Sequence, residues 1–559
     1  MIEKCSKKNK SKKLEEALAS SRKNSSLYLI IVSLIFIFAN IASLTPITGI
    51  PIFFYKHRYL CKKSINSKNF NIVCSRKFVC SNKSKYGVDY ILDEKYNVNL
   101  ISFITSYDIY CSGTKRILLA SSFFLGQLIG TIIYPYLIAL NGIINSLSLT
   151  YLIIFISYLI LAKFNIYLIG LIFYVIASMS YQICVIGFKQ YIVEMSGPEE
   201  RPTFLLFNLL SQILSGFFVV LISYLTLDFK YLLFYSALIC IIGVILVKLF
   251  LVESVRILFV QNKINDLMRN LEYISGINKS KECFEEWKNN NNNIFNQNEF
   301  YMNIKEESLK PLIDKDKDKD KNNNKEESEK NNKSELTEIN YLSIWQYPSQ
   351  VKLLILFSFA TFYVNYSMLL AQLEIVKQKK FFLSLLEGYT CDMIGYIFGV
   401  MITKIDNYTR KECFLLLTFL LSAIFLIGTI FYSWHNQYIF IFFRIFVNSL
   451  DANFNLYNFE SFPTLTRPTG VAINRIFGKF FNLFTPLIMI NFPKMGYLCG
   501  LLFGGGLFLL SFYLSPKETK DHCIYEYPLE MENYFGKEKI SSNNENDYNE
   551  EEQYLLKNN

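Results

Sequence analysis

Charged and amide side chains recur at helical spacing inside two apolar segments in the last third of this 559-residue chain. The first segment carries Arg444, Asn448, Asp451, Asn455 and Asn458. The second carries Arg475, Lys479 and Asn482. Residues three or four apart share one face of a helix, so each set forms a polar stripe. A charge inside a membrane helix is costly and faces a cavity or a partner. The two stripes therefore predict a polar cavity that binds a charged solute.

Two interpretations of the second stripe stay open. Lys479, assisted by Arg475, could attract a carboxylate at low dielectric, or Asp451 could neutralise Lys479 as a structural pair. Asp451 is also the best-placed carboxylate to carry a coupling proton, because such a group must lie at depth in the membrane. Three further side chains are candidates for the cavity lining, although each could instead pack helices together: Tyr363, Tyr366 and Gln212.

The elements that carry these stripes are predicted by long apolar runs, since a spanning helix needs about 20 consecutive apolar residues. Six runs lie at 27–54, 117–140, 143–162, 165–188, 203–226 and 231–252. Six more lie at 351–372, 390–405, 412–433, 437–457, 470–491 and 495–515. We therefore expect an all-α membrane protein with about twelve transmembrane helices in two six-helix bundles.

An internal repeat supports two related halves. Glu194 is followed seven residues later by Arg201, and Glu460 is followed seven residues later by Arg467. The offset between the two pairs is 460 − 194 = 266. The loops that begin at 139 and 406 differ by 267, and Glu253 and Glu518, which close the sixth and twelfth runs, differ by 265. Duplication is the economical explanation of these nearly constant offsets.

The remaining segments set the predicted topology. We expect a basic cytoplasmic tail at 1–26, a first bundle at 27–252 with an extracellular loop at 55–115, a cytoplasmic linker at 253–345, a second bundle at 346–515 and a disordered cytoplasmic tail at 516–559. The linker contains a low-complexity run that cannot bury a core. The formal charge of +10 comes from Lys and Arg between and outside the runs, which indicates topology rather than nucleic-acid binding. The partners expected are the lipid bilayer and a small solute, in the plasma membrane in preference to an organelle.

The long loop after the first run is rich in cysteine. It contains Cys61, Cys74, Cys80 and Cys111, and the glycosylation sequon that begins at Asn82. Four cysteines in one polar loop predict two disulfides in an oxidising compartment, with their pairing open. Reduced surface thiols are the alternative.

Several of these segments resemble the major facilitator superfamily and, within it, the organic cation, organic anion and carnitine transporter family. The resemblance rests on 107–111 with the following SSFFLGQLIG, 194–201, 228–230, 253–256, 460–467 and 516–520. It implies two bundles that rock about a central site. It also places Lys479 where anion and carnitine members carry Arg and cation members carry Asp. An organic anion or zwitterion is therefore the expected substrate, with a proton or other ion as a possible coupling partner.

The same resemblance implies gates built from charges at helix ends, where ion pairs form in one state and break in the other. The predicted gating residues are Glu194, Arg201, Glu253, Arg256, Asp406, Arg410, Glu460 and Arg467. The family's charged turn is reduced to ALNGII at 139–144, so the charge network is expected to be missing in the first half. Interfacial charges that only set topology are the alternative.

Other function classes fit less well. The three histidines, His57, His435 and His522, lie outside the apolar runs, so an intramembrane enzyme or zinc site is not expected. No phosphate-binding G-x-x-x-x-G-K-[ST] motif occurs, and we expect no cofactor or metal. A sugar or other metabolite porter of the same superfamily remains possible, as does a receptor or scaffold that no longer transports.

Overall fold

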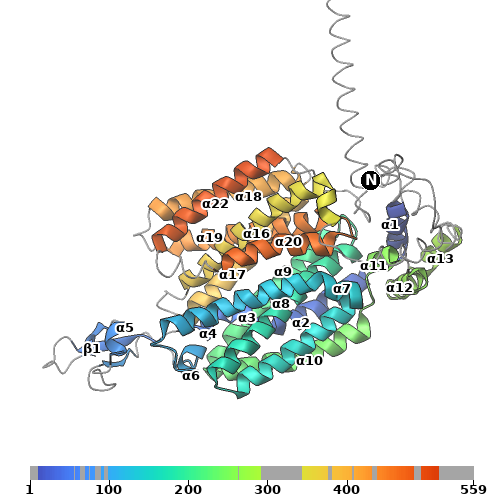
Figure 1. The fold of residues 1–559 in the computed structure, drawn as a ribbon. Helices are drawn as coiled ribbons and strands as arrows, with labels where there is room; N and C mark the ends of the chain where they lie inside the picture. Colours follow the sequence, from blue (N-terminus) through green and yellow to red (C-terminus); the bar gives the residue numbers. More distant parts are fainter. Residues whose placement is uncertain are drawn as a thin grey trace, which may run out of the picture.

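The computed structural model describes residues 10–55, 57–62, 70–74, 76–81, 90–93, 99–261, 263–290, 343–375, 381–405, 408–430, 437–483 and 493–514. Two groups of long helices lie side by side, with the first half of the chain in blue to green and the second half in yellow to red (Figure 1). Long helices suit a membrane because every backbone N–H and C=O is satisfied within the segment.

The first half contains six spans. The first is a run of three short helices, α2 (Leu27–Ser43), α3 (Thr45–Thr48) and α4 (Ile50–Phe53). It is followed by α7 (Gly113–Lys163), α8 (Tyr167–Met195), α9 (Arg201–Thr226) and α10 (Phe229–Phe250). The 51 residues of α7 form two spans that meet at Gly142, whose φ of 76° is outside the helical region.

The second half contains the other six. They are α16 (Pro348–Ile375), α17 (Phe381–Lys404), α18 (Arg410–Ile430), α19 (Gln437–Ser461), α20 (Arg467–Asn482) and α22 (Pro493–Leu514). Among the described residues, eight helices are long and apolar enough to cross a membrane by length and composition. The double length of α7, the interrupted first span and the more polar α19 and α20 bring the total to the predicted twelve.

The same helix pairs pack in both halves. In the first half α2 packs against α9 and α7 against α8, and in the second half their equivalents α16 and α20, and α17 and α19, pack in the same way. Both α9 and α20 also begin with Arg-Pro-Thr, at Arg201 and Arg467. Proline suits the first turn of a helix, where its missing N–H is not needed. These shared pairings support the internal duplication.

Opposite ends of the bundles carry different additions (Figure 1). At one end the loop after the first span forms β1 (Tyr59–Lys62), β2 (Phe70–Val73), β3 (Tyr90–Leu92), α5 (Arg76–Val79) and α6 (Phe103–Ser106). The three strands make an antiparallel sheet in the order β2-β1-β3. We call this end the disulfide side, because Cys61 is bonded to Cys74 and Cys80 to Cys111.

The other end carries helices from the N-terminal segment and from the linker, and we call it the linker side. These are α1 (Lys10–Ser20), α11 (Val255–Val260), α12 (Ile264–Ile277) and α13 (Lys281–Asn290), with a short 3-10 helix, η2 (Ser343–Gln346), before the second half. Helix α1 packs against α12 and α13 and buries Leu14, Ala17 and Leu18 completely. The N-terminal segment predicted as a tail thus contains a docked helix.

Candidate functional site

The two halves meet mainly along two helix pairs, α7 with α20 and α9 with α17, and α19 also contacts α8 and α9. Close approach at the second pair depends on Gly216 of α9, where a Cβ atom would lie 2.5 Å from Cδ1 of Tyr389 in α17. The Tyr389 hydroxyl also donates a hydrogen bond of 2.7 Å to the backbone oxygen of Thr48 in the first span. The two halves are therefore in direct contact next to the interior, where side chains of the predicted polar stripes lie.

Four charged side chains are buried in the interior at this meeting of the halves. Arg475 and Lys479 come from α20, Asp451 from α19 and Lys189 from α8. Their exposed fractions are only 7%, 6%, 9% and 4%. Electrostatic interactions connect Lys189, Arg475 and Lys479 with Asp451. We call these four residues the interior charge cluster.

Two of the three cations in the cluster, Arg475 and Lys479, make hydrogen bonds to amides rather than to a carboxylate. Arg475 Nη2 donates to Asn455 Oδ1 at 3.0 Å, and Lys479 Nζ donates to Asn365 Oδ1 at 2.8 Å. Asp451 accepts from Asn455 Nδ2 at 2.8 Å. Among the described residues Asp451 has no ion pair within 4.0 Å, so the predicted structural alternative of an Asp451–Lys479 pair is not formed here. The cluster thus holds three cations and one carboxylate.

Lys189 is the member that the sequence reasoning missed. It has no charged residue three or four positions away in α8, so no stripe marked it. In the part of the chain that the structure describes, its amine has no hydrogen bond or ion pair. Lys189 directly follows the apolar run at 165–188 and lies inside α8. A lysine inside a membrane helix is already a sign of function, and this was the signal available.

The cluster lies near the middle of the bundles. Arg475 and Lys479 are eight and twelve residues beyond the start of α20 at Arg467. At 1.5 Å per residue this places them about 12 and 18 Å from the linker-side end. The hydrocarbon core is about 30 Å thick, so these charges lie at the depth where transporters bind their substrates.

Gln212 is the predicted lining residue that reaches the cluster from the first half. It accepts a 2.5 Å hydrogen bond from the hydroxyl of Tyr396 in α17. The same hydroxyl lies 3.5 Å from Asp451 Oδ2. Tyr396, which was not predicted, therefore connects Gln212 of one half with Asp451 of the other.

Arg444 and Asn448 are placed differently from the prediction. Arg444 Nε donates to Asp392 Oδ1 in α17 at 2.8 Å, and a second bond joins Arg444 Nη2 to Oδ2. Asn448 Nδ2 donates to the same carboxylate at 2.7 Å. These two members of the first stripe are therefore held inside the second half by a carboxylate that the sequence reasoning did not single out.

Tyr363 and Tyr366 also turn away from the interior charge cluster. The Tyr363 hydroxyl lies 3.4 Å from Ser422 Oγ in α18, and Tyr366 donates to the backbone oxygen of Gly496 in α22 at 2.6 Å. Both hydroxyl groups thus bond to helices within the second half, which corresponds to the packing role considered as the alternative.

The predicted gating charges meet at the linker side, but across the two halves. Glu194 Oε1 lies 3.2 Å from Arg467 Nη1, and Arg201 Nη1 lies 3.7 Å from Glu460 Oε1. The two equivalent turns, 194–201 and 460–467, face each other, so that each glutamate pairs with the arginine of the other half. We call these four residues the crossed pairs. Arg410 adds a contact within the second half, with Nε 3.5 Å from Glu460 Oε2.

The first half replaces its reduced charged turn with a carboxylate from further along the chain. Glu253 accepts hydrogen bonds from the backbone N–H groups of Ile143 at 2.9 Å and Ile144 at 3.1 Å. A side chain at Gly142 would collide with this carboxylate. Glu253 thus places a carboxylate at this turn, where it bonds to backbone N–H groups rather than to the arginines of the family's charged turn. Arg256 Nε donates to the Glu194 backbone oxygen at 2.8 Å.

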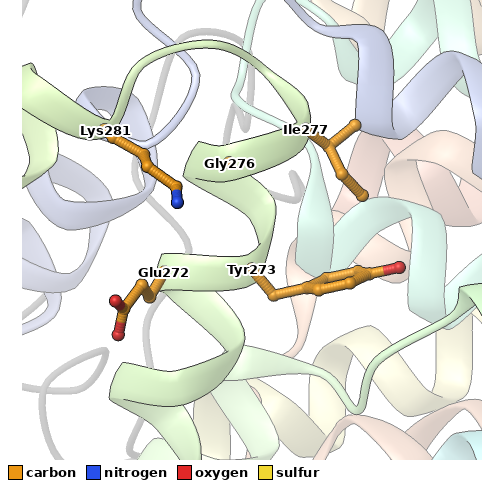
Figure 2. Close-up of a pocket in the computed structure, with 5 residues that line it drawn as sticks. All are labelled: Glu272, Tyr273, Gly276, Ile277 and Lys281. Carbon is orange, nitrogen blue, oxygen red and sulfur yellow. The ribbon is translucent and has the colours of Figure 1, made fainter.

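Some predicted residues and one pocket lie outside this arrangement. Asp406 and Asn82 are outside the described residues. An open pocket of about 370 Å³ lies on the linker helices, lined by Glu272, Tyr273, Gly276, Ile277 and Lys281 (Figure 2). These residues belong to α12 and the start of α13, so the pocket is not part of the interior charge cluster.

Comparison with known proteins identifies the superfamily. The family model of the Major Facilitator Superfamily matches residues 96–486, which is most of the chain. No curated protein sequence matches. The structure is similar to that of the proton:xylose symporter XylE bound to 6-bromo-6-deoxy-D-glucose, at 15% identity, covering 89% of this chain and 98% of that chain with a TM-score of 0.60.

A second solved structure agrees with this fold. It is a partially occluded inward open conformation of the xylose transporter XylE from E. coli, at 14% identity, covering 89% of this chain and 100% of that chain with a TM-score of 0.53. Identities this low show a shared fold and not a shared substrate. With the family match, the twelve spans and the duplicated halves, the chain belongs to the Major Facilitator Superfamily and is a multi-pass membrane transporter.

Proposed function

We propose that this transporter carries a small organic anion or zwitterion, which binds at the interior charge cluster. The observation that supports this is the excess of buried positive charge, with Lys189, Arg475 and Lys479 against Asp451 alone among the described side chains. Buried charge without a counter-charge is expensive. A carboxylate or similar anion between the halves would offset that cost, so the site favours anions over neutral or cationic solutes.

Each residue has a role in this proposal. Lys479 is the principal partner of the substrate anion, and Arg475 offers a planar group that suits a carboxylate. Lys189 adds a positive charge from the first half. Asp451 would receive the ammonium group of a zwitterion, and it remains our candidate for carrying a coupling proton. Gln212 and Tyr396 supply neutral hydrogen-bonding groups beside it.

Alternating access would depend on forming and breaking the crossed pairs. Their two ion pairs join the halves at the linker side, so that side is closed in this structure. We infer that these pairs break when the linker side opens. On this proposal the linker side is cytoplasmic and the disulfide side extracellular, since disulfides persist in oxidising compartments. Replacing Asn82 with Gln should abolish a glycosidase-sensitive mass shift, whereas an unglycosylated wild type would count against this orientation.

The decisive test is a substrate panel in proteoliposomes that contain the purified full-length protein. Uptake of radiolabelled benzoate and succinate as anions, betaine as a zwitterion, choline as a cation and xylose as a neutral sugar would be compared, with and without a pH gradient. We expect uptake of an anion or the zwitterion, and loss of anion selectivity in Lys479→Asp. Unchanged selectivity in that variant would contradict the assignment of Lys479.

Two alternatives predict different results in the same assay. A sugar porter would take up xylose and leave the anions outside, but a neutral sugar provides no charge to offset the three cations. A receptor or scaffold would bind a solute without uptake or counterflow. The turn at Gly142 counts against loss of function, because Glu253 fills it with two hydrogen bonds.

A further inference from the structure

Each residue of the crossed pairs also has a polar partner within its own half. Glu194 accepts hydrogen bonds from Ser254 Oγ at 2.5 Å and from Gln190 Nε2 at 2.7 Å. On the second-half side, Glu460 pairs with Arg410. These partners stay with their residue when the halves separate, and so they limit the cost of breaking a crossed pair.

The two arginines of the crossed pairs differ in what their own half provides. Arg467 donates to the backbone oxygens of Phe459 at 2.9 Å and Phe462 at 3.0 Å. For Arg201, which is completely buried, the corresponding partner in the described structure is Glu15 of α1, with Oε1 3.4 Å from Nη2. Arg201 is thus shared between Glu15 of its own half and Glu460 of the other half.

In the part of the chain that the structure describes, Glu15 and α1 are held by the first half and by the linker that follows it. The Glu15 carboxylate also pairs with Arg256 of α11. The segment that follows α1 is fixed by Arg22, whose Nη1 bonds Glu200 at 2.9 Å and the Met195 backbone oxygen at 3.0 Å. Asn278 Nδ2 and Ser280 Oγ both donate to the Ser21 backbone oxygen. Helix α1 therefore moves with the first half rather than bridging the halves.

We propose that Glu15 is a gating residue that retains Arg201 when the Arg201–Glu460 pair breaks, and so favours opening of the linker side. A partner shifts a two-state equilibrium only through its differential interaction with the two states. In the closed state Arg201 has two carboxylates, and in the open state it has Glu15 alone. The contribution of Glu15 is therefore larger in the open state. This proposal concerns the gate and does not depend on the nature of the substrate.

The test measures the separation of the linker-side ends directly, by pulsed electron paramagnetic resonance on the full-length protein in nanodiscs. Spin labels are placed through Glu199→Cys in the loop before α9 and Leu465→Cys in the loop before α20, both exposed positions. The partly exposed free cysteines Cys283 and Cys499 are replaced by serine, and so are Cys5 and Cys523, which lie outside the described residues. The readout is the ratio of long to short distances, which reports open and closed linker sides.

We expect Glu15→Gln to lower the open-to-closed ratio by at least about fivefold, the lower end of typical coupling between sites. Glu16→Gln is the matched control, since the adjacent Glu16 has no ion pair in the described part, and its ratio should equal that of the wild type. Glu15→Asp keeps the charge and should fall between the wild type and Glu15→Gln. If Glu15→Gln does not fold, the direction of the shift in Glu15→Asp decides.

Two results would overturn the proposal. A higher open-to-closed ratio in Glu15→Gln would mean that α1 clasps the gate shut, and an unchanged ratio would mean that Glu15 only anchors α1. Because the readout is a distance and not uptake, failure of the anion proposal in the substrate panel would leave this test unaffected.

Discussion

Glu194 of α8 and Arg467 of α20 form a fully buried ion pair, although 273 residues separate them in the chain. Breaking a buried pair by removing one partner costs about 3–5 kcal/mol, because the other charge is left uncompensated. Since this pair joins the two halves, its loss should destabilise the closed linker side more than either half alone.

Arg467→Gln is therefore expected to increase opening of the linker side and to slow uptake of the transported solute by at least about tenfold, because the carrier would return to the closed state less often. Uptake rates in proteoliposomes and the spin-label distances above would measure both effects. Arg269→Gln is the control, because the Arg269 side chain is 81% exposed. Equal uptake in Arg467→Gln and the wild type would show that the crossed pair does not control the gate.

Lys189→Met should weaken binding of an anionic substrate while leaving the fold intact. Loss of one charge-assisted contact costs about 1.5–3 kcal/mol, which corresponds to a rise in KM of roughly tenfold or more. Lys248→Met provides a comparison, since Lys248 is an exposed lysine in the last turn of α10. Equal KM values for the two variants would show that Lys189 does not contribute to substrate binding.

The Asp392–Arg444 pair is expected to stabilise the second half rather than to bind substrate. Asp392→Ala should lower stability by about 3–5 kcal/mol, because it leaves the buried Arg444 charge without its partner. Arg444→Ala should cost less, because Asp392 is only partly buried and keeps its hydrogen bond from Asn448. The double variant should be less destabilised than the sum of the single variants. Melting temperatures of the purified protein in detergent would test this double-mutant cycle, and strict additivity would argue against direct coupling.

Gly216 should tolerate no side chain, because a Cβ atom there would meet the Tyr389 ring. Gly216→Val is expected to slow uptake by separating α9 from α17, with an overpacking cost of about 1–3 kcal/mol. The matched control is Gly505→Val, because nothing lies within 4 Å of a Cβ atom at Gly505. Uptake rates for both variants would be compared, and a normal rate in Gly216→Val would show that α9 and α17 need not approach so closely.

The contribution of Glu15 should persist across the physiological pH range. Burial by itself would raise the pKa of Glu15, but Arg256 and Arg201 beside it lower the pKa below the ordinary value of a glutamate. A lowered pKa gives stabilisation that is present above the ordinary value and lost only as pH falls through the shifted one. Lowering the pH from 7.5 to 5.5 should therefore not remove the distance difference between the wild type and Glu15→Gln. Loss of this distance difference at pH 5.5 would contradict the lowered pKa of Glu15.

The sequence by itself determined the architecture. Apolar runs of the length of a bilayer predict the spans, because a spanning helix must satisfy its own backbone and face lipid. The recurrence of Glu194 and Arg201 as Glu460 and Arg467 predicted the duplication. The family match confirms the superfamily, while the organic-ion branch remains a proposal. These features are local or periodic, so they can be read along the chain.

Only the tertiary structure decided which charges meet. The stripe that holds Arg444 and Asp451 looked continuous in sequence, yet Arg444 turns to Asp392 while Asp451 faces the interior. Lys189 belongs to the interior charge cluster although it lies in the first half, away from both stripes. Glu15 contacts Arg201 although it lies in α1, outside the spans. An ion pair depends on the distance between atoms of different helices, and that distance is set by helix packing. The sequence alone therefore identified the four charges of the crossed pairs, which we propose as the gate, but not their partners.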